Sequence, residues 1–380
     1  MLRHTFRTPF FFLFGILFFL SHDLKAQQTK HEAIVHQQVL RNYITYIPAN
    51  YTGKKAVPIV LNFHGLTMSA TVQMELGDFR SIADTAGFLI IHPQGLVHNG
   101  QTHWNIGGIT KGSQVDDLGF VNRLLDTLIK EYNVDTIRIY STGYSNGGGM
   151  SHLLACQLSD RIAAIASVAG TMTFEVYDSC NAQRPVPVLQ IHGTNDQSSK
   201  YDGSTWGKKV VDVLNYWARS NNCTNDTTWS NLPNKDTTDN STVQKLVYNK
   251  CDDCSNVVHY KIINGSHSWP GSRWANNDIS SSEVIWDFFR NYDINGCVTA
   301  GIINSEKPDL FSIYPNPSTG LVQVKTDKKV FDVNVYSLDG RLITSMSNTK
   351  IIDLKLLTAG TYILRFTTSG YSSTKRITIK

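Results

Sequence analysis

The sequence predicts an α/β domain, with a mostly parallel sheet covered by helices on both faces, followed by a small C-terminal β-sandwich. Up to about residue 292, short apolar runs alternate with longer amphipathic stretches, and beyond residue 310 only short strand-like segments and turns remain. Apolar runs separated by helices are typical of parallel strands with both faces buried. The 380 residues, 41% of them hydrophobic, are enough for one large core and a smaller unit.

The start of the chain is typical of a secretory signal peptide. Arg3 and Arg7 precede an apolar run over residues 9–20, and Ala26 is a small residue suited to a cleavage site. The run is shorter than the roughly 20 apolar residues that a membrane span needs. No cysteine stands at the cut site, so lipidation there is not expected. We therefore expect residues 1–26 to be removed and the mature chain to have no transmembrane segment.

The α/β domain is expected over residues 27–296. Its apolar runs are rich in Val, Ile and Leu, and most end in a turn that contains glycine, as buried strands do. We expect these strands at residues 57–65, 88–95, 136–143, 162–170, 186–196, 243–249 and 257–265. The amphipathic stretches between them predict helices at residues 71–86, 116–132, 146–158, 206–220 and 282–292.

The character of the sequence changes after residue 296. Residues 297–309 have little helical pattern and are expected to form a linker. Residues 310–380 hold alternating segments such as "LVQVKT" and "GTYILRF", and Asp339-Gly340 and Ala359-Gly360 stand where hairpin turns are needed. A β-sandwich of about 70 residues is within the usual size range of independent domains.

The charge distribution argues against a nucleic-acid partner. The formal net charge is +4, but the signal segment and the residues from 309 onward carry the excess, which leaves 22 basic and 25 acidic residues over 27–308. A nucleic-acid surface would instead cluster its basic residues.

Six cysteines in an exported chain favour disulfide bonds, although the sequence does not fix which cysteines pair. The "CDDC" segment at residues 251–254 could be interpreted as a metal or redox site. It lacks a second CxxC and a strand–helix context, so structural bridging is the better interpretation. We expect no metal site and no cofactor.

The segment "GYSNGGGM", residues 143–150, follows a predicted strand and admits two interpretations. A phosphate-binding P-loop needs a lysine and then Ser or Thr after its last glycine, where this chain has Met150 and Ser151. A nucleophilic serine on a sharp strand-to-helix turn needs small residues two positions to either side. Gly143 and Gly147 flank Ser145 in this way. Ser145 is therefore the candidate nucleophile.

A serine hydroxyl needs a base within hydrogen-bonding reach and a carboxylate that orients the base. The α/β-hydrolase order along the chain is Ser, then Asp or Glu, then His. Asp196 follows the predicted strand "VPVLQIHG", and His267 lies in the "INGSHSWPG" loop after another strand. Asp202 is an alternative acid, and His192, at a strand end, is expected to make a structural hydrogen bond instead.

Ester chemistry also needs two N–H donors for the tetrahedral oxyanion. One is expected to be the backbone N–H of Asn146, which opens the helix after the nucleophile. The other is expected to be the backbone N–H of Leu66, because "FHGL" comes directly after an apolar strand. His64 in that turn is expected to shape the loop.

At these motifs the sequence resembles a family of secreted esterases, the polyhydroxybutyrate depolymerase-like and feruloyl esterase-like enzymes. The resemblance spans most of residues 41–286 and includes "FHG", "HWN", "DDLGFV", "GYSNGG", "VLQIHGTND" and "GSHSWPG". It implies an α/β-hydrolase fold, with Ser145 as nucleophile, Asp196 as acid and His267 as base.

The sequence departs from that family at two places. Members often carry a cysteine after His-Gly, where this chain has Leu66. The aromatic cluster beside the family's tryptophan is thinned to "WNIGG", which weakens the case for binding a polyhydroxyalkanoate. Trp104 and Trp269 are candidates for packing an aromatic acyl group, with ordinary core tryptophans as the alternative.

The tail from residue 311 to 380 resembles the C-terminal sorting domain of bacterial type IX secretion cargo, chiefly through "YPNPSTG". This implies a Bacteroidota-like host and outer-membrane export to the medium or the cell surface, with the type IX machinery as partner. A carbohydrate-binding β-sandwich is the weaker alternative, because the tail has no tryptophan.

The expected function is that of a secreted serine carboxylic-ester hydrolase, acting on feruloyl or acetyl esters of plant polysaccharide. The alternatives are a polyhydroxyalkanoate depolymerase, a peptidase on the same fold, and a non-enzymatic surface adhesin.

Overall fold

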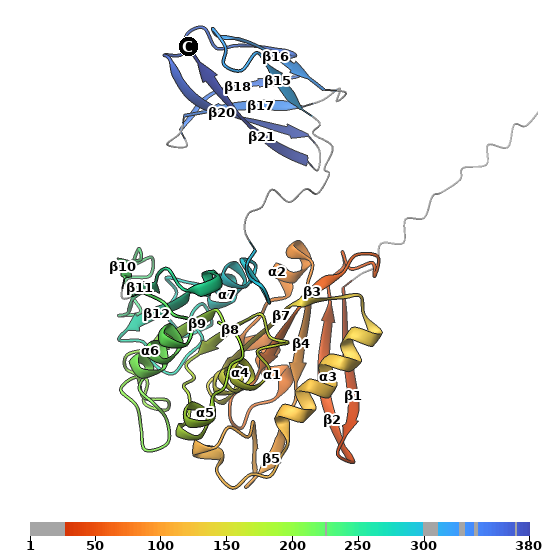
Figure 1. Ribbon diagram of the computed structural model, residues 1–380, viewed down its shortest axis with the longest axis vertical. Helices are drawn as coiled ribbons and strands as arrows, with labels where there is room; N and C mark the ends of the chain where they lie inside the picture. The colour runs from red at the N-terminus through yellow and green to blue at the C-terminus, as the bar shows by residue number, and fades with distance from the viewer. Residues whose placement is uncertain (1–26, 225, 299–310, 327–330, 338–340, 369–370) are drawn as a thin grey trace, which may run out of the picture. The chain divides into compact units, whose positions relative to one another are not determined.

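The computed structural model describes residues 27–224, 226–298, 311–326, 331–337, 341–368 and 371–380. The chain divides into two compact units, residues 1–299 and 300–380, and each is described by itself (Figure 1). The expected signal peptide and most of the expected linker lie outside the described residues.

The first unit contains a ten-stranded sheet in the order β1-β2-β4-β3-β7-β8-β9-β12-β11-β10. The six central strands, from β4 to β12 in that order, are parallel, and two strands at each edge are antiparallel. In Figure 1, β1–β2 and β10–β12 stand at opposite edges. The strands are β1 (Gln28–His36), β2 (Val39–Ile47), β3 (Val57–Phe63), β4 (Leu89–Pro93), β7 (Val134–Tyr144), β8 (Ala164–Val168), β9 (Val188–Gly193), β10 (Thr227–Asn231), β11 (Thr242–Tyr248) and β12 (Val257–Ile263).

Helices cover both faces of this sheet, which confirms the predicted α/β fold. Alternate strand residues point to opposite faces, so Ile59 and Leu61 join one apolar cluster while Val60 joins the other. Buried residues of α3, α4, α5 and α6 belong to the first cluster, and buried residues of α7 belong to the second. The helices are α1 (Ala70–Leu76), α2 (Arg80–Ala86), α3 (Asp117–Glu131), α4 (Asn146–Gln157), α5 (Phe174–Ser179), α6 (Val210–Ser220) and α7 (Ser281–Phe289).

The single helix expected over residues 71–86 is instead two helices, α1 and α2, so that prediction is wrong. The break lies at Gly77, where a side chain would be in close contact with its neighbours. A Cβ there would lie 2.9 Å from Nε2 of Gln73 and 3.0 Å from the ring of Trp269. Asp78 then accepts a 2.8 Å hydrogen bond from the backbone N–H of Arg80, the first residue of the second helix.

Two small hairpins connect these elements. The first, β5 (Leu96–His98) with β6 (Gln101–His103), follows β4 and leads to a short 3₁₀ turn, η1 (Gly108–Thr110). The second pairs β13 (Tyr292–Asp293) with β14 (Gly296–Cys297).

All six cysteines are paired, which confirms the expected disulfides. The two cysteines of "CDDC" bond to different partners, so this segment is not a CxxC redox pair. Cys254, in the turn η2 (Asp252–Cys254), reaches Cys297 at the end of the first unit. The pairs are Cys156–Cys180, Cys223–Cys251 and Cys254–Cys297.

The second unit has two antiparallel sheets, as the alternating segments predict. One has the order β15-β16-β19 and the other β18-β17-β20-β21. Side chains from both sheets, among them Val324, Val333 and Phe366, form one apolar cluster, as in a sandwich. The strands are β15 (Ser312–Tyr314), β16 (Leu321–Lys325), β17 (Asp332–Tyr336), β18 (Leu342–Ser347), β19 (Ile351–Asp353), β20 (Gly360–Thr368) and β21 (Tyr371–Ile379).

Candidate active site

Ser145 occupies a sharp turn between β7 and α4. Its backbone has φ 54° and ψ −115°, a conformation that a residue with a side chain rarely adopts. A Cβ on Gly143 would lie 2.5 Å from the backbone of Gly147, and a Cβ on Gly147 would overlap the carbonyl of Phe63. The two glycines are therefore needed for the turn to pack against β3, and the turn leaves the serine half-buried.

The structure brings Ser145, His267 and Asp196 together at one edge of the sheet. They follow β7, β12 and β9, three parallel strands whose carboxyl ends meet there. Oγ of Ser145 lies 3.0 Å from Nε2 of His267, and Nδ1 of His267 lies 2.7 Å from Oδ2 of Asp196. Asp202 is exposed, and among the described residues Asp196 is the one carboxylate in hydrogen-bonding range of His267.

The carboxylate of Asp196 is buried and surrounded by donors. Oδ1 accepts the backbone N–H groups of Ser198 at 2.9 Å and Ser199 at 2.8 Å, and Oδ2 accepts from His267. Burial by itself raises the pKa of this carboxyl, but hydrogen bonds from His192 and His267 outweigh burial and hold the pKa below its usual range. Asp196 is therefore ionised at neutral pH and can stabilise a protonated imidazole.

A chain of buried hydrogen bonds stands behind this carboxylate. Nε2 of His192 donates to the carbonyl of Ser199 at 2.7 Å, because a carbonyl oxygen only accepts. Nδ1 of His192 must then accept from the amide of Gln190, at 3.1 Å. Oε1 of Gln190 lies 3.2 Å from Nε2 of His152, whose Nδ1 accepts the indole N–H of Trp217 at 3.1 Å. Every donor in this chain thus points the same way.

The two N–H groups expected to bind an oxyanion are free of protein acceptors in the part of the chain that the structure describes. Leu66 lies in the turn after β3, and Asn146 is the first residue of α4. His64 shapes that turn, since its Nδ1 donates to the carbonyl of Gly65 at 2.7 Å and its Nε2 accepts from the N–H of Gly95 at 2.9 Å. Burial lowers the pKa of His64 to about 4, so the ring is neutral.

A pocket of about 450 Å³ opens onto these groups. The hydroxyl of Ser145, the imidazole of His267 and the residues Leu66 and Asn146 line it, and Thr67, Thr171 and Ser198 add polar positions. Its apolar wall consists of Met68, Ile106, Ile109 and Trp206.

Neither tryptophan suggested by the sequence lines this pocket. Trp104 is fully buried and packs edge-on against Phe63, with ring centroids 5.0 Å apart. Trp269 is 2% exposed and packs against Phe79. The structure thus favours the alternative of core tryptophans for both. The tryptophan at the pocket is Trp206, which sequence reasoning missed; its position after β9, in the loop that follows Asp196, was the available signal.

A Ser–His–Asp set at the carboxyl edge of a mostly parallel sheet with helices on both faces defines an α/β-hydrolase-like protein. A solved structure supports this fold. The acetyl xylan esterase from Aspergillus awamori superposes with a TM-score of 0.52 and 12% identity, covering 69% of this chain and 98% of that chain.

Residues 41–212 match the family described as Esterase PHB depolymerase, and residues 312–380 match the Secretion system C-terminal sorting domain. The α/β unit therefore belongs to that esterase family, which is related to feruloyl and acetylxylan esterases, and the C-terminal unit is a sorting domain. The sorting domain indicates export across the outer membrane to the cell surface or the medium.

Two curated relatives align with the α/β unit. The chain is 31% identical over 281 residues to the "Bifunctional acetylxylan esterase/xylanase XynS20E" of Neocallimastix patriciarum, covering 74% of this chain and 37% of that protein. It is 28% identical over 265 residues to "Feruloyl esterase B" of Piromyces equi, covering 67% and 46% respectively. The chain spans less than half the length of each relative.

In the described parts of the chain, none of the helices combines the length and the apolar character that crossing a membrane would require.

Proposed function

We propose that the α/β unit is a serine carboxylic-ester hydrolase with Ser145 as nucleophile, His267 as base and Asp196 as acid. The observation that carries this proposal is the continuous hydrogen-bonded line from Ser145 through His267 to Asp196, with bonds of 3.0 and 2.7 Å. The Ser145 end of this line opens onto a pocket. The same pocket is lined by Leu66 and Asn146, whose backbone N–H groups have no protein acceptor among the described residues.

In the proposed reaction, Oγ of Ser145 attacks the ester carbonyl carbon while its proton passes to Nε2 of His267. The N–H groups of Leu66 and Asn146 bind the oxyanion that forms on the carbonyl oxygen. His267 then gives the proton to the alcohol oxygen, the C–O bond breaks and an acyl-serine remains. Water then gives a proton to His267 and attacks the acyl carbon; the bond to Oγ of Ser145 breaks, Oγ takes the proton from His267, and the acid is released. Asp196 stabilises the imidazolium in both halves of the reaction.

The substrate class proposed is a feruloyl or acetyl ester of a plant polysaccharide. A volume of about 450 Å³ and an apolar wall with Trp206 suit a planar aromatic acyl group better than an acetyl group. The names of the two curated relatives point to the same two acyl groups. We further propose that the sorting domain delivers the enzyme to the type IX secretion machinery.

The test compares wild type and Ser145→Ala on 4-nitrophenyl acetate, methyl ferulate, acetylated xylan and short polyhydroxybutyrate. We expect wild type to hydrolyse methyl ferulate, and Ser145→Ala to lose roughly a million-fold in kcat, as removal of a catalytic serine does elsewhere. Undiminished turnover by a folded Ser145→Ala would refute the assignment. If wild type hydrolysed only polyhydroxybutyrate, the proposed substrate would be wrong and a polyhydroxyalkanoate depolymerase would be favoured. If a fluorophosphonate did not label wild type, the alternative of a non-enzymatic surface adhesin would be favoured.

A further inference from the structure

One residue, Trp104, connects the two segments that carry the proposed oxyanion donors, one through its indole ring and the other through its backbone. The indole N–H of Trp104 donates to the carbonyl of His64 at 2.9 Å. The backbone N–H of Trp104 donates to Oδ1 of Asn146 at 2.7 Å, and Nδ2 of Asn146 donates back to the carbonyl of Trp104 at 3.1 Å. All three residues are buried, and Trp104 and His64 are fully so.

These hydrogen bonds are made by residues close in sequence to the two donor N–H groups. His64 stands two residues before Leu66, and the side chain that bonds to Trp104 belongs to Asn146 itself. A hydrogen-bond donor stabilises an oxyanion only when it is held close to the distance and direction that the transition state requires. The indole of Trp104 holds the His64 segment while its backbone is bonded to Asn146, so a loss of the indole bond would let the Leu66 donor move relative to the Asn146 donor.

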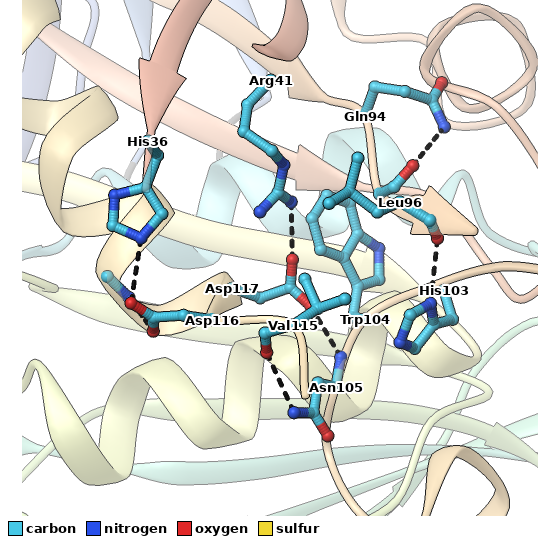
Figure 2. Close-up of polar contacts among 12 residues, drawn as sticks. His36, Arg41, Gln94, Leu96, His103, Trp104, Asn105, Val115, Asp116 and Asp117 are labelled. Carbon is cyan, nitrogen blue, oxygen red and sulfur yellow. Dashed lines mark hydrogen bonds and ion pairs between the residues drawn. The ribbon is translucent and has the colours of Figure 1, made fainter. Parts of the chain in front are cut away.

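The segment of Trp104 is itself held by a buried ion pair (Figure 2). Nη2 of Arg41 donates to Oδ1 of Asp117 at 2.6 Å, and Oδ2 of Asp117 accepts the backbone N–H of Asn105 at 2.7 Å. The amide of Asn105 also donates to the carbonyl of Val115 at 2.9 Å. Each charged side chain of the pair is 1% exposed.

A fully buried ion pair contributes little net stability compared with well-packed apolar residues. Its presence beside Trp104 therefore favours a role in fixing geometry. The guanidinium of Arg41 also lies 3.8 Å from the ring centre of Phe120, on α3, so the pair connects the Trp104 segment to a long helix.

We propose that Trp104 is a positioning residue that fixes the separation of the two oxyanion donors, Leu66 N–H and Asn146 N–H. The inference builds on the proposed esterase function and assigns Trp104 no contact with substrate. A tryptophan that merely filled the core would contribute to stability through its volume, and loss of its N–H would then leave catalysis unchanged once the protein is folded.

The test uses the full chain with Trp104→Phe, 4-nitrophenyl acetate as substrate and phenylboronic acid as a tetrahedral transition-state mimic. We expect kcat to fall about 10- to 100-fold with KM changed less than about threefold, because the loss is confined to the transition state. The inhibition constant of phenylboronic acid should rise by a similar factor to the loss in kcat/KM, since its adduct with Ser145 uses the same donors.

The matched control is Tyr140→Phe. The hydroxyl of Tyr140 donates to the carbonyl of Tyr292 at 2.7 Å in the apolar cluster on the opposite face of the sheet, so this variant also leaves one buried backbone carbonyl unbonded. It should retain wild-type kcat. A folded Trp104→Phe with wild-type kcat and boronate affinity would overturn the inference.

If Trp104→Phe does not fold, benzothienylalanine at position 104 keeps the shape of the ring and removes only the N–H. The same selective loss of kcat would support the inference, and unchanged kcat would overturn it. An inactive wild type would instead defeat the proposed esterase function, which separates the two failures.

Discussion

Oδ2 of Asp196 lies 3.3 Å from Nε2 of His192, and the same oxygen accepts the hydrogen bond from His267. His192 thus belongs to the surroundings of the proposed acid although it does not itself line the pocket. The donors of Trp217, His152 and Gln190 all point toward His192, so Nδ1 of His192 accepts a hydrogen bond. Nε2 therefore carries the N–H, which faces Ser199 and Asp196.

We expect His192→Leu to lower kcat on 4-nitrophenyl acetate about tenfold with little change in KM. The substitution leaves the carbonyl of Ser199 and one side of the carboxylate without a donor, a loss of about 1–3 kcal/mol in a buried site. His192→Gln, whose amide can replace the N–H, should recover part of the rate. Equal steady-state kinetics for His192→Leu and wild type would contradict this role.

The pKa of Asp196 predicts how stability changes with acidity. Its folded-state pKa is depressed below the unfolded value of about 3.9, so its contribution to the free energy of unfolding is present above that pH and is lost as the pH falls through the folded pKa. Urea denaturation should therefore find Asp196→Asn less stable than wild type at about pH 7, with a smaller difference at about pH 3. A difference that grew on acidification would be inconsistent with a depressed pKa.

The backbone at Ser145 predicts a stabilising but inactivating substitution. Glycine adopts φ 54° without the penalty that a Cβ imposes, so Ser145→Gly should be more stable than Ser145→Ala by about 1–2 kcal/mol. Ser145→Ala is the matched control because it also lacks the hydroxyl but keeps the Cβ. Chemical denaturation measures the difference, and equal unfolding free energies would show that the turn is not strained.

The position of Trp206 predicts a change in acyl selectivity. Trp206→Ala removes the largest apolar group from the pocket wall and should lower kcat/KM for methyl ferulate about 10- to 100-fold. Hydrolysis of 4-nitrophenyl acetate should change less than about threefold, because an acetyl group is too small to use the wall. Trp274→Ala removes a tryptophan that is 85% exposed and outside the pocket, and it should affect neither substrate. Parallel losses on both substrates would exclude a selective role.

The fold could be predicted because its signals are local and repeated. Apolar strands separated by amphipathic helices leave few topologies open, and parallel strands bring their carboxyl ends to one edge. That is why residues as distant along the chain as Ser145 and His267 can be expected from the sequence to meet.

Other features depend on contacts that a sequence does not display. Gly77, where the helix breaks, packs against the ring of Trp269, nearly 200 residues away, and the helical pattern runs through it unchanged. The burial of Trp104 and the placement of Trp206 at the pocket depend on how loops fold over the sheet edge. The pairing of cysteines likewise depends on which helices, turns and loops are neighbours in the fold.

The disulfide between Cys254 and Cys297 has a consequence for maturation. It fastens the last strand of the α/β unit to the turn before β12, the strand that leads to His267. Proteolytic cleavage on the C-terminal side of Cys297 would remove the sorting domain. The new C-terminus would then still be bonded through Cys297 to the turn before β12. Removal of the sorting domain after export would then leave the turn before β12 covalently held, and β12 precedes the loop of His267, the proposed base.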